Sequence, residues 1–392
     1  MSRRIIAQCF LGSLCLCSQA EWTRHTIDDT LEGADGVRLA DVNRDGWQDI
    51  VTGWEESGQV RVYQNPGPEK TRKPWPAVTV GKVISPEDAV FADLDRDGQM
   101  DVISSCEGSN RSVYVHWAPT ESVNYMDASR WETEPLPALQ GQEMWMFTTP
   151  GDINGDGRID LVVGSKGKEG TIGWLKAPTS PRKLEGWQWH PLQAIAWVMT
   201  IRVMDMDQDG DLDILFSDRK EKKSGIYALI NPSHDQNKGI WRTILIGDKG
   251  EEVMFMDVLS NNQKTWCICS AIRKRQIHRL TFHADTLKST QGPIWKFADD
   301  FGTAKAVVAG DMDSDGKMDL VVSCENAKGS KSGVFWLPRA ETNMPRSISG
   351  SKGTKFDRME VIDLDGDGDL DILTCEERDL LGVIWYENPH IN

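Results

Sequence analysis

The sequence lacks the features that mark several common protein classes. Beyond its first 20 residues it has no run of about 20 apolar residues, so we expect no membrane-spanning helix. It contains no G-x-S-x-G, H-E-x-x-H or glycine-rich phosphate-binding motif, which leaves a serine hydrolase, a zinc peptidase or a nucleotide-binding enzyme without support. Little of the chain shows helical periodicity. A mainly β-structured protein is therefore expected.

Cysteine is scarce and poorly placed for a disulfide framework. Three of the eight cysteines lie within the first 20 residues, and the others have no paired spacing. These are Cys106, Cys267, Cys269, Cys324 and Cys375. We expect them to be buried free thiols. The formal charge of −16 disfavours nucleic acid and anionic membranes as partners.

The first 20 residues have a composition of their own. MSRRIIAQCFLGSLCLCSQA combines two arginines, an apolar stretch and a small-x-small ending. This pattern is typical of a cleaved secretory signal peptide. We therefore expect a mature domain over residues 21–392 that is secreted or periplasmic, monomeric and not inserted in a membrane.

An acidic motif recurs along the chain with a period of about 50 residues. Its form is D-x-[DN]-x-D-G-x-x-D-[ILV], as in DLDGDGDLDI near the C-terminus. Six copies begin at Asp41, Asp93, Asp152, Asp205, Asp311 and Asp363. A degenerate seventh copy, MDVLSNNQKTWCI, fits the one long gap with Asp257 at its first position and lacks the later acids. We expect this fifth loop to bind no metal.

The segments around each acidic motif also repeat. A short apolar segment such as GVRLA precedes it and one such as DIVTGW follows it. A third segment often ends in proline, and a fourth often opens on tryptophan. Seven repeats of four short strands predict an all-β fold, a single seven-bladed β-propeller with four antiparallel strands per blade. EWTRHTI, at the start of the mature chain, would supply the missing fourth strand of the last blade.

With these motifs the chain resembles the FG-GAP/VCBS repeat family, which includes the calcium-binding blades of integrin α-subunit propellers. The resemblance covers residues 21–392 and rests on six intact motifs. It implies a seven-bladed propeller with calcium in its loops. It does not imply the function of an integrin.

The acidic loops have the chemistry of a calcium site. Oxygen atoms at alternate positions of a short loop converge on one point, and Ca²⁺ takes 6 to 8 oxygen ligands. The ninth-position acid and the flanking strands distinguish the loops from an EF-hand. We expect about six structural calcium ions, held by side chains at positions one, three, five and nine and by the backbone carbonyl at position seven. These residues are Asp41, Asn43, Asp45, Trp47, Asp49; Asp93, Asp95, Asp97, Gln99, Asp101; Asp152, Asn154, Asp156, Arg158, Asp160; Asp205, Asp207, Asp209, Asp211, Asp213; Asp311, Asp313, Asp315, Lys317, Asp319; and Asp363, Asp365, Asp367, Asp369, Asp371.

A ligand site is more plausible on the opposite face of the disc. Because strands alternate in direction, the second-to-third and fourth-to-first loops emerge there. The candidates are Glu55, Glu107, Trp145, Lys166, Trp197, Arg219, Arg273, Glu325 and Glu376. Blades six, seven, one and two contribute acids to this face, and blades three to five contribute mostly bases. The charges could orient a polar ligand or be ordinary solvated charges. The two tryptophans interrupt the repeat and could stack on sugars or pack at the rim.

Two functions fit these observations. The first is a recognition or scaffolding module that binds a glycan or an extracellular protein. The alternative is a carbohydrate lyase or dehydratase that performs an elimination on a uronate or keto-sugar, with Lys, Arg, Tyr or Glu as the base. Fungal aldos-2-ulose dehydratases carry a similar propeller, but this likeness concerns the fold only. We favour the first function because few catalytic residues stand out.

Overall fold

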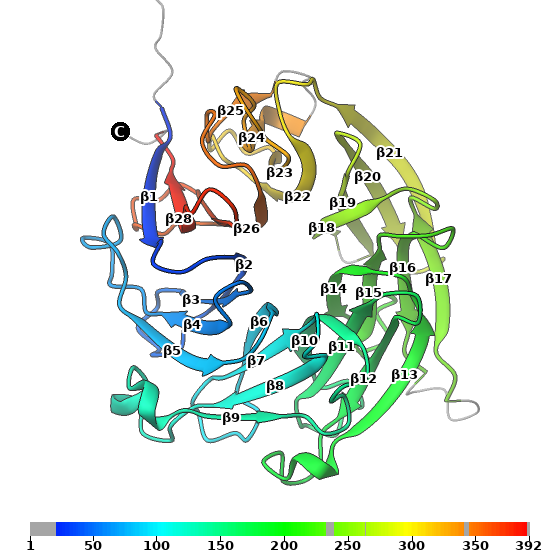
Figure 1. The fold of residues 1–392 in the computed structure, drawn as a ribbon. Coiled ribbons are helices and arrows are strands. Elements are labelled where there is room, and N and C mark those ends of the chain that lie inside the picture. Colours follow the sequence, from blue (N-terminus) through cyan, green and yellow to red (C-terminus); the bar gives the residue numbers. More distant parts are fainter. Residues whose placement is uncertain (1–20, 233–238, 263, 341–344, 390–392) are drawn as a thin grey trace, which may run out of the picture.

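The computed structural model describes residues 21–232, 239–262, 264–340 and 345–389. The expected signal peptide lies outside the described residues. Those residues form seven four-stranded antiparallel sheets arranged in a ring (Figure 1). The predicted all-β, seven-bladed propeller is confirmed. Within the described part, no helix is long and apolar enough to span a membrane.

The first four blades follow one another along the chain. Blade one is β2 (Ala34–Ala40), β3 (Asp49–Trp54), β4 (Gln59–Tyr63) and β5 (Ala77–Lys82). Blade two is β6 (Pro86–Ala92), β7 (Asp101–Cys106), β8 (Ser112–Trp117) and β9 (Glu132–Pro135). Blade three is β10 (Met144–Gly151), β11 (Asp160–Lys166), β12 (Thr171–Lys176) and β13 (Gln188–Ala194). Blade four is β14 (Val198–Met204), β15 (Asp213–Asp218), β16 (Gly225–Ile230) and β17 (Arg242–Gly247).

The last three blades complete the ring. Blade five is β18 (Val253–Asn262), β19 (Thr265–Ile272), β20 (Gln276–His283) and β21 (Lys288–Lys296). Blade six is β22 (Thr303–Gly310), β23 (Asp319–Glu325), β24 (Val334–Leu337) and β25 (Arg346–Ser347). Blade seven is β26 (Phe356–Ile362), β27 (Asp371–Glu376), β28 (Gly382–Glu387) and β1 (Thr23–Asp28). Short 3₁₀ helices are η1 (Ser122–Asn124), η2 (Ala128–Arg130), η3 (Leu184–Gly186) and η4 (Pro338–Ala340).

The first strand of each blade lies next to the central opening. These are β2, β6, β10, β14, β18, β22 and β26 (Figure 1). Each inner strand pairs with the second strand of its own blade, and the register of each pair shifts once, except in blade five, where it shifts twice. Such an irregularity bends a strand and changes the direction of a side chain. At the outer edge of blade seven, β1 pairs antiparallel with β28, with Thr23 opposite Glu387.

The tryptophans that recur with the repeat belong to the core. Trp75, Trp131 and Trp187, which precede fourth strands, are buried, and so is Trp295, which lies near the end of β21 and not at its start. Trp117, Trp336 and Trp385 in third strands are also buried. Large aromatic side chains stabilise a fold mainly through the area that they bury. The repeated positions therefore act in packing between neighbouring sheets.

Blade five departs from the predicted register. Its four strands are present, and Cys267 and Cys269 are buried free thiols, as expected. The placement of Asp257 at the first position of an acidic loop is wrong. Asp257 lies inside β18, opposite Cys269, and β18 continues to Asn262 before β19 begins at Thr265. In blade five, two longer hairpin strands take the place of the acidic loop. The spacing of the other copies therefore predicts the wrong position for Asp257.

Candidate functional site

The six acidic loops share one backbone geometry. The second carboxylate oxygen of the first aspartate accepts the N–H of the sixth-position glycine, as between Asp41 and Gly46 at 3.0 Å and between Asp311 and Gly316 at 2.8 Å. The glycine at this position has a positive φ in every loop, for example 92° at Gly46, which favours glycine strongly. The loops therefore close on themselves through their own carboxylates.

The ninth aspartate has a structural role that the sequence analysis missed. Asp49 is fully buried, and its two oxygens accept the N–H groups of Val42 and Asn65, each at 2.8 Å. The five other loops repeat both bonds, through Asp101, Asp160, Asp213, Asp319 and Asp371. This aspartate ties the start of the acidic loop to the end of the third strand. Burial raises the pKa of Asp49 to about 6 and the pKa values of Asp101 and Asp371 to about 8.

The loop carboxylates fit a hard cation. One oxygen from each of Asp93, Asp95 and Asp97 lies within 4.8 Å of the other two, and similar groups occur in blades four and six. The Oδ1 atoms of Asp93, at the first position of its loop, and of Asp207 and Asp313, at the third position of theirs, are each buried without a hydrogen-bond partner in the described structure. Oxygen-only ligand sets suit Ca²⁺. The residues present therefore match the ion that the resemblance implies.

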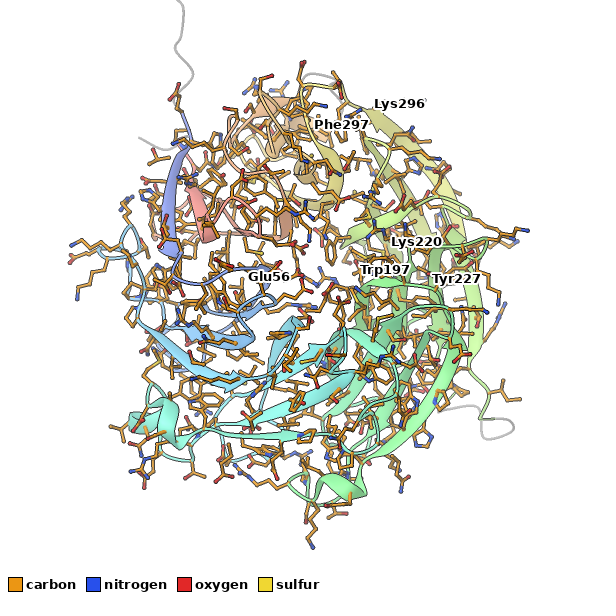
Figure 2. The ribbon with its side chains drawn as sticks, viewed as in Figure 1. Glu56, Trp197, Lys220, Tyr227, Lys296 and Phe297 are labelled. Carbon is orange, nitrogen blue, oxygen red and sulfur yellow. The ribbon has the colours of Figure 1, made fainter. Side chains whose placement is uncertain are left out.

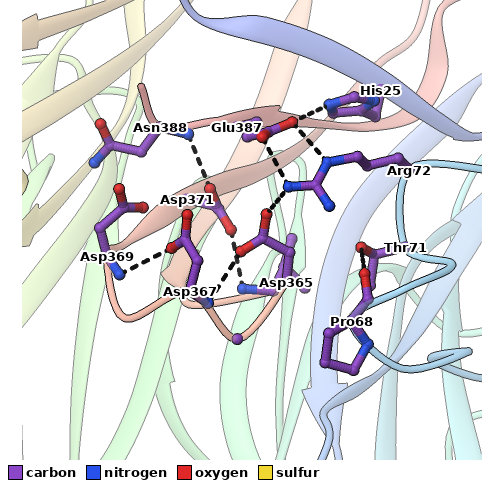
Figure 3. A network of polar contacts seen from close by, with 12 residues as sticks. His25, Pro68, Thr71, Arg72, Asp365, Asp367, Asp369, Asp371, Glu387 and Asn388 are labelled. Carbon is purple, nitrogen blue, oxygen red and sulfur yellow. Dashed lines mark hydrogen bonds and ion pairs between the residues drawn. The ribbon is translucent and has the colours of Figure 1, made fainter. Parts of the chain in front are cut away.

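Some loops are also bound to the neighbouring blade (Figure 3). Arg72, from the β4–β5 connection of blade one, donates to Asp365 at 2.5 Å and to Glu387 at 2.8 Å. Glu387 also lies 2.6 Å from His25 of β1. In the same way, Arg182 donates to Asp95 across the boundary between blades three and two at 2.5 Å. These arginines link the acidic loops to side chains outside their own blade.

The candidates on the opposite face divide into charged pairs. Lys166 of blade three contacts Glu107 of blade two, and Arg273 of blade five lies 2.7 Å from Glu325 of blade six. These two ion pairs stand where the acidic and basic halves of the face meet. The expected division of charge is therefore present, but it is neutralised at both boundaries.

Glu252, which precedes β18, organises the basic half. Its Oε1 lies 2.9 Å from both Arg219 and Arg273 and 3.0 Å from Lys220. Burial opposes ionisation of this carboxyl, but the hydrogen bonds from Arg273, Lys220 and Arg219 hold its pKa down at about 2. Glu252 was not among the predicted residues, whose charged members all lie at or just after the ends of second strands, because it lies in a connection between a fourth and a first strand.

The two most deeply buried candidates, Trp145 and Glu376, serve the fold. Trp145 is fully buried, donates to the Leu139 carbonyl at 3.0 Å and packs edge-on against Trp189. The carboxylate of Glu376, which is 1% exposed, accepts backbone N–H groups that include those of Lys355 and Asp379. Neither side chain presents a surface to a ligand. Of the two uses proposed for Trp145, the structure shows packing.

Trp197 lines a cavity on the opposite face. Lys166 Nζ lies 4.6 Å from the centroid of its ring, and the Arg219 guanidinium lies 4.5 Å from it. A cavity of about 650 Å³ opens here; its lining residues are Met144, Lys166, Gly167, Lys168, Ala196, Trp197, Lys220 and Glu221. An adjoining cavity of about 430 Å³ shares Met144, Lys166 and Lys168. Figure 2 shows Trp197 and Lys220 across the central opening from Glu56.

The comparisons with known proteins agree with this architecture. A family model described as an FG-GAP-like repeat matches residues 41–104 and 144–216. The chain therefore carries FG-GAP-like repeats, which confirms the resemblance drawn from its acidic motifs. A search of curated proteins returns no match.

Solved structures show the same fold. BBS1N, in a crystal structure with ARL6DN soaked with lead, is 12% identical, with a TM-score of 0.56 and coverage of 95% of this chain and 99% of that chain. The mercury-soaked crystal of the same complex gives 12% identity, a TM-score of 0.54 and coverage of 94% and 97%. Saccharomyces cerevisiae Sqt1 is 10% identical, with a TM-score of 0.53 and coverage of 94% and 98%. At this identity the likeness concerns the fold alone.

Proposed function

We propose that the protein is a secreted recognition module whose propeller is stabilised by calcium in its six acidic loops. The signal-like sequence of residues 1–20 supports secretion. The convergent oxygens and the buried, unpartnered carboxylate oxygens of the loops support calcium. When bound, the ion would neutralise the crowded carboxylates, and the residues of each loop would hold it beside the first two strands of the blade.

We further propose that the ligand is an acid-bearing glycan that binds in the cavity beside Trp197. The observation that carries this proposal is the cavity of about 650 Å³ whose lining combines three lysines with a tryptophan and a methionine. Ligand sites are concave and mostly apolar, with a few polar groups that fix orientation. Lys168 is exposed and has no ion pair among the described residues, so its ammonium group is free to meet a carboxylate.

Binding of defined oligosaccharides tests this proposal. Calorimetric titration should show binding of uronate-containing oligosaccharides, weaker binding at high salt, and little binding of neutral oligosaccharides of the same length. Lys168→Glu should lower the affinity at least tenfold. Lys296→Glu, an equal charge change on the exposed face of β21, should leave it unchanged. Equal effects of both variants, or equal binding of neutral sugars, would contradict the assignment, and binding of an acidic protein alone would replace the glycan.

One observation favours the lyase alternative. Glu377 lies near the axis. Burial, and to a smaller extent the negative charge of Asp357, raises the pKa of the Glu377 carboxyl group to about 8, even though Lys355 contacts it. A carboxyl group with a pKa near neutrality is suited to proton transfer. Formation of an unsaturated product from a uronate oligosaccharide, lost in Glu377→Gln, would establish catalysis. Binding without any product supports the recognition module.

A further inference from the structure

A ring of side chains surrounds the axis where the inner strands change register. In four blades the residue at the shift is Glu87, Met146, Met199 or Lys305. Each lies six residues before the first aspartate of its acidic loop, and Asp35 and Asp357 hold that position in blades one and seven. Met146 and Met199 are almost completely buried. The fold therefore accepts an apolar side chain at this position, and packing alone does not explain the charged ones.

The charged members of the ring converge on Asp35. One carboxylate oxygen from each of Asp35, Glu55 and Glu87 lies within 4.8 Å of the other two. Asp35, Asp357 and Glu377 form a second such group. We call these five carboxylates, from Asp35, Glu55, Glu87, Asp357 and Glu377, the axial cluster. Glu55 and Glu377 come from the loops that follow β3 and β27, so the cluster lies toward the face opposite the acidic loops.

Lysines neutralise only part of the axial cluster. Lys305 Nζ lies 2.8 Å from Asp357 Oδ2, and Lys355 contacts Glu377. These contacts leave Asp35, Glu55 and Glu87 without a cationic partner among the described residues. The positive charge of Lys166 favours ionisation of Glu87 through space, but Lys166 itself is paired with Glu107.

Asp35 is the unusual member of the cluster. It is 6% exposed, yet its carboxylate makes no hydrogen bond and no ion pair within the described structure. Glu87 also makes none there, and Glu55 has a single long contact, with the Ser85 hydroxyl at 3.3 Å. A buried carboxylate is normally hydrogen-bonded, paired or coordinated to a metal ion, because its desolvation is costly. The unpartnered Asp35 side chain therefore points to a ligand that supplies positive charge.

We propose that Asp35, Glu55 and Glu87 bind a divalent cation at the propeller axis, as a site separate from the acidic loops. Three carboxylates form an oxygen-only set, which selects hard cations such as Ca²⁺ or Mg²⁺. Two lysines against five carboxylates leave a negative excess that such an ion offsets. Three protein ligands fill only part of its coordination sphere, so the ion keeps positions for water or for an oxygen of a bound ligand.

Metal content of matched variants tests the axial site. Protein desalted from buffer containing Ca²⁺ or Mg²⁺ is analysed for bound metal per chain. Glu87→Gln and Asp35→Asn should each hold one ion fewer than the wild-type protein. Glu360→Gln removes one charge from the inner strand β26, outside the axial cluster, and should hold the wild-type number. An unchanged metal content in both cluster variants would overturn the proposal.

Two further measurements separate this site from folding effects and from the loops. Glu87→Met introduces the residue that blades three and four carry at the same position, so its circular dichroism spectrum should stay native while one ion is lost. Asp363→Asn with Asp365→Asn should remove an ion from the blade-seven loop and leave the axial ion in place. In crystals soaked with Mn²⁺, an anomalous peak is expected between Asp35 and Glu87. Its absence, with peaks in the loops, would overturn the axial site while leaving the loop sites intact.

Discussion

Lys305 and Asp357 form a buried ion pair across the boundary between blades six and seven, with Nζ 2.8 Å from Oδ2. Their side chains are only 9% and 2% exposed. Blades three and four place Met146 and Met199 at the same position of their inner strands. Ion pairs of this kind add little net stability over apolar residues, whereas loss of one partner leaves a buried charge. The fold therefore tolerates either an ion pair or two apolar side chains at these two positions, but not a charged side chain opposite an apolar one.

Lys305→Met should lower the free energy of unfolding by about 3–5 kcal/mol, because Asp357 then stays buried without its cation. The double variant Lys305→Met with Asp357→Met should recover most of this loss, since the axis then carries two more of its own apolar residues. Urea denaturation of the wild-type protein, both single variants and the double variant measures the coupling. Additive losses in the double variant would contradict the pairing.

Calcium removal should make stability depend on pH. Without metal, burial raises the pKa values of Asp101 and Asp371 to about 8, above the value of about 3.9 in an unfolded chain. The folded state then holds more protons than the unfolded state between these values. This stabilisation is complete below about pH 4 and is lost as the pH rises toward about 8. The metal-free protein should melt at a lower temperature at about pH 8 than at about pH 5.

Bound calcium should remove this dependence, because it keeps the loop carboxylates ionised in the folded state. The gain in melting temperature on adding Ca²⁺ is therefore expected to be larger at about pH 8 than at about pH 5. Metal is best removed with a chelating resin, since soluble chelators lose affinity in acid. The same pH dependence with and without Ca²⁺ would argue against metal in the loops.

Cys267 should be the most reactive thiol among the described residues. A hydrogen bond from Cys269 lowers the pKa of Cys267 to about 6 against the effect of burial, and Arg279 assists. Cys267 and Arg279 line a cavity of about 390 Å³ at the end of blade five where the other blades carry their acidic loops. Burial instead raises the pKa of Cys106 to about 12. The rate at which a small reagent alkylates Cys267, measured by mass spectrometry, should rise with pH, with a midpoint near pH 6.

Arg279→Gln supplies the comparison for this thiol. Its loss of positive charge should move the titration of Cys267 to higher pH and leave the melting temperature nearly unchanged. Alkylation of Cys106 at the same rate as Cys267 in the native protein would contradict the predicted order of reactivity.

The two tryptophans that interrupt the repeat should behave differently. Trp145→Ala should cost about 3–5 kcal/mol of stability, because it opens a cavity in a packed core. Trp197→Ala, at the half-buried wall of the cavity, should cost less stability but weaken binding of the acidic oligosaccharide. Chemical denaturation and calorimetric titration of both variants separate these roles. A larger stability loss for Trp197→Ala would reverse the assignment.

The sequence by itself determined the features that depend on neighbours along the chain. The acidic motif, its glycine at the sixth position and the alternating apolar segments predict strands and turns because these elements form from local backbone and side-chain preferences. Their regular period predicts seven blades. For the same reason the residues of the six acidic loops, from Asp41 to Asp371, could be located one by one as the proposed calcium ligands.

Only the tertiary structure decided what happens between blades. Asp257 lies in β18 and not in the predicted loop, because strand pairing, and not the spacing along the sequence, sets the register. The partners of Lys305, the burial of Trp145 and the unpaired carboxylate of Asp35 arise from residues of different blades that meet when the ring forms. Such contacts depend on the curvature and closure of the whole propeller. No local sequence pattern encodes these contacts, so the axial cluster and the cavity beside Trp197 could be recognised only in the folded structure.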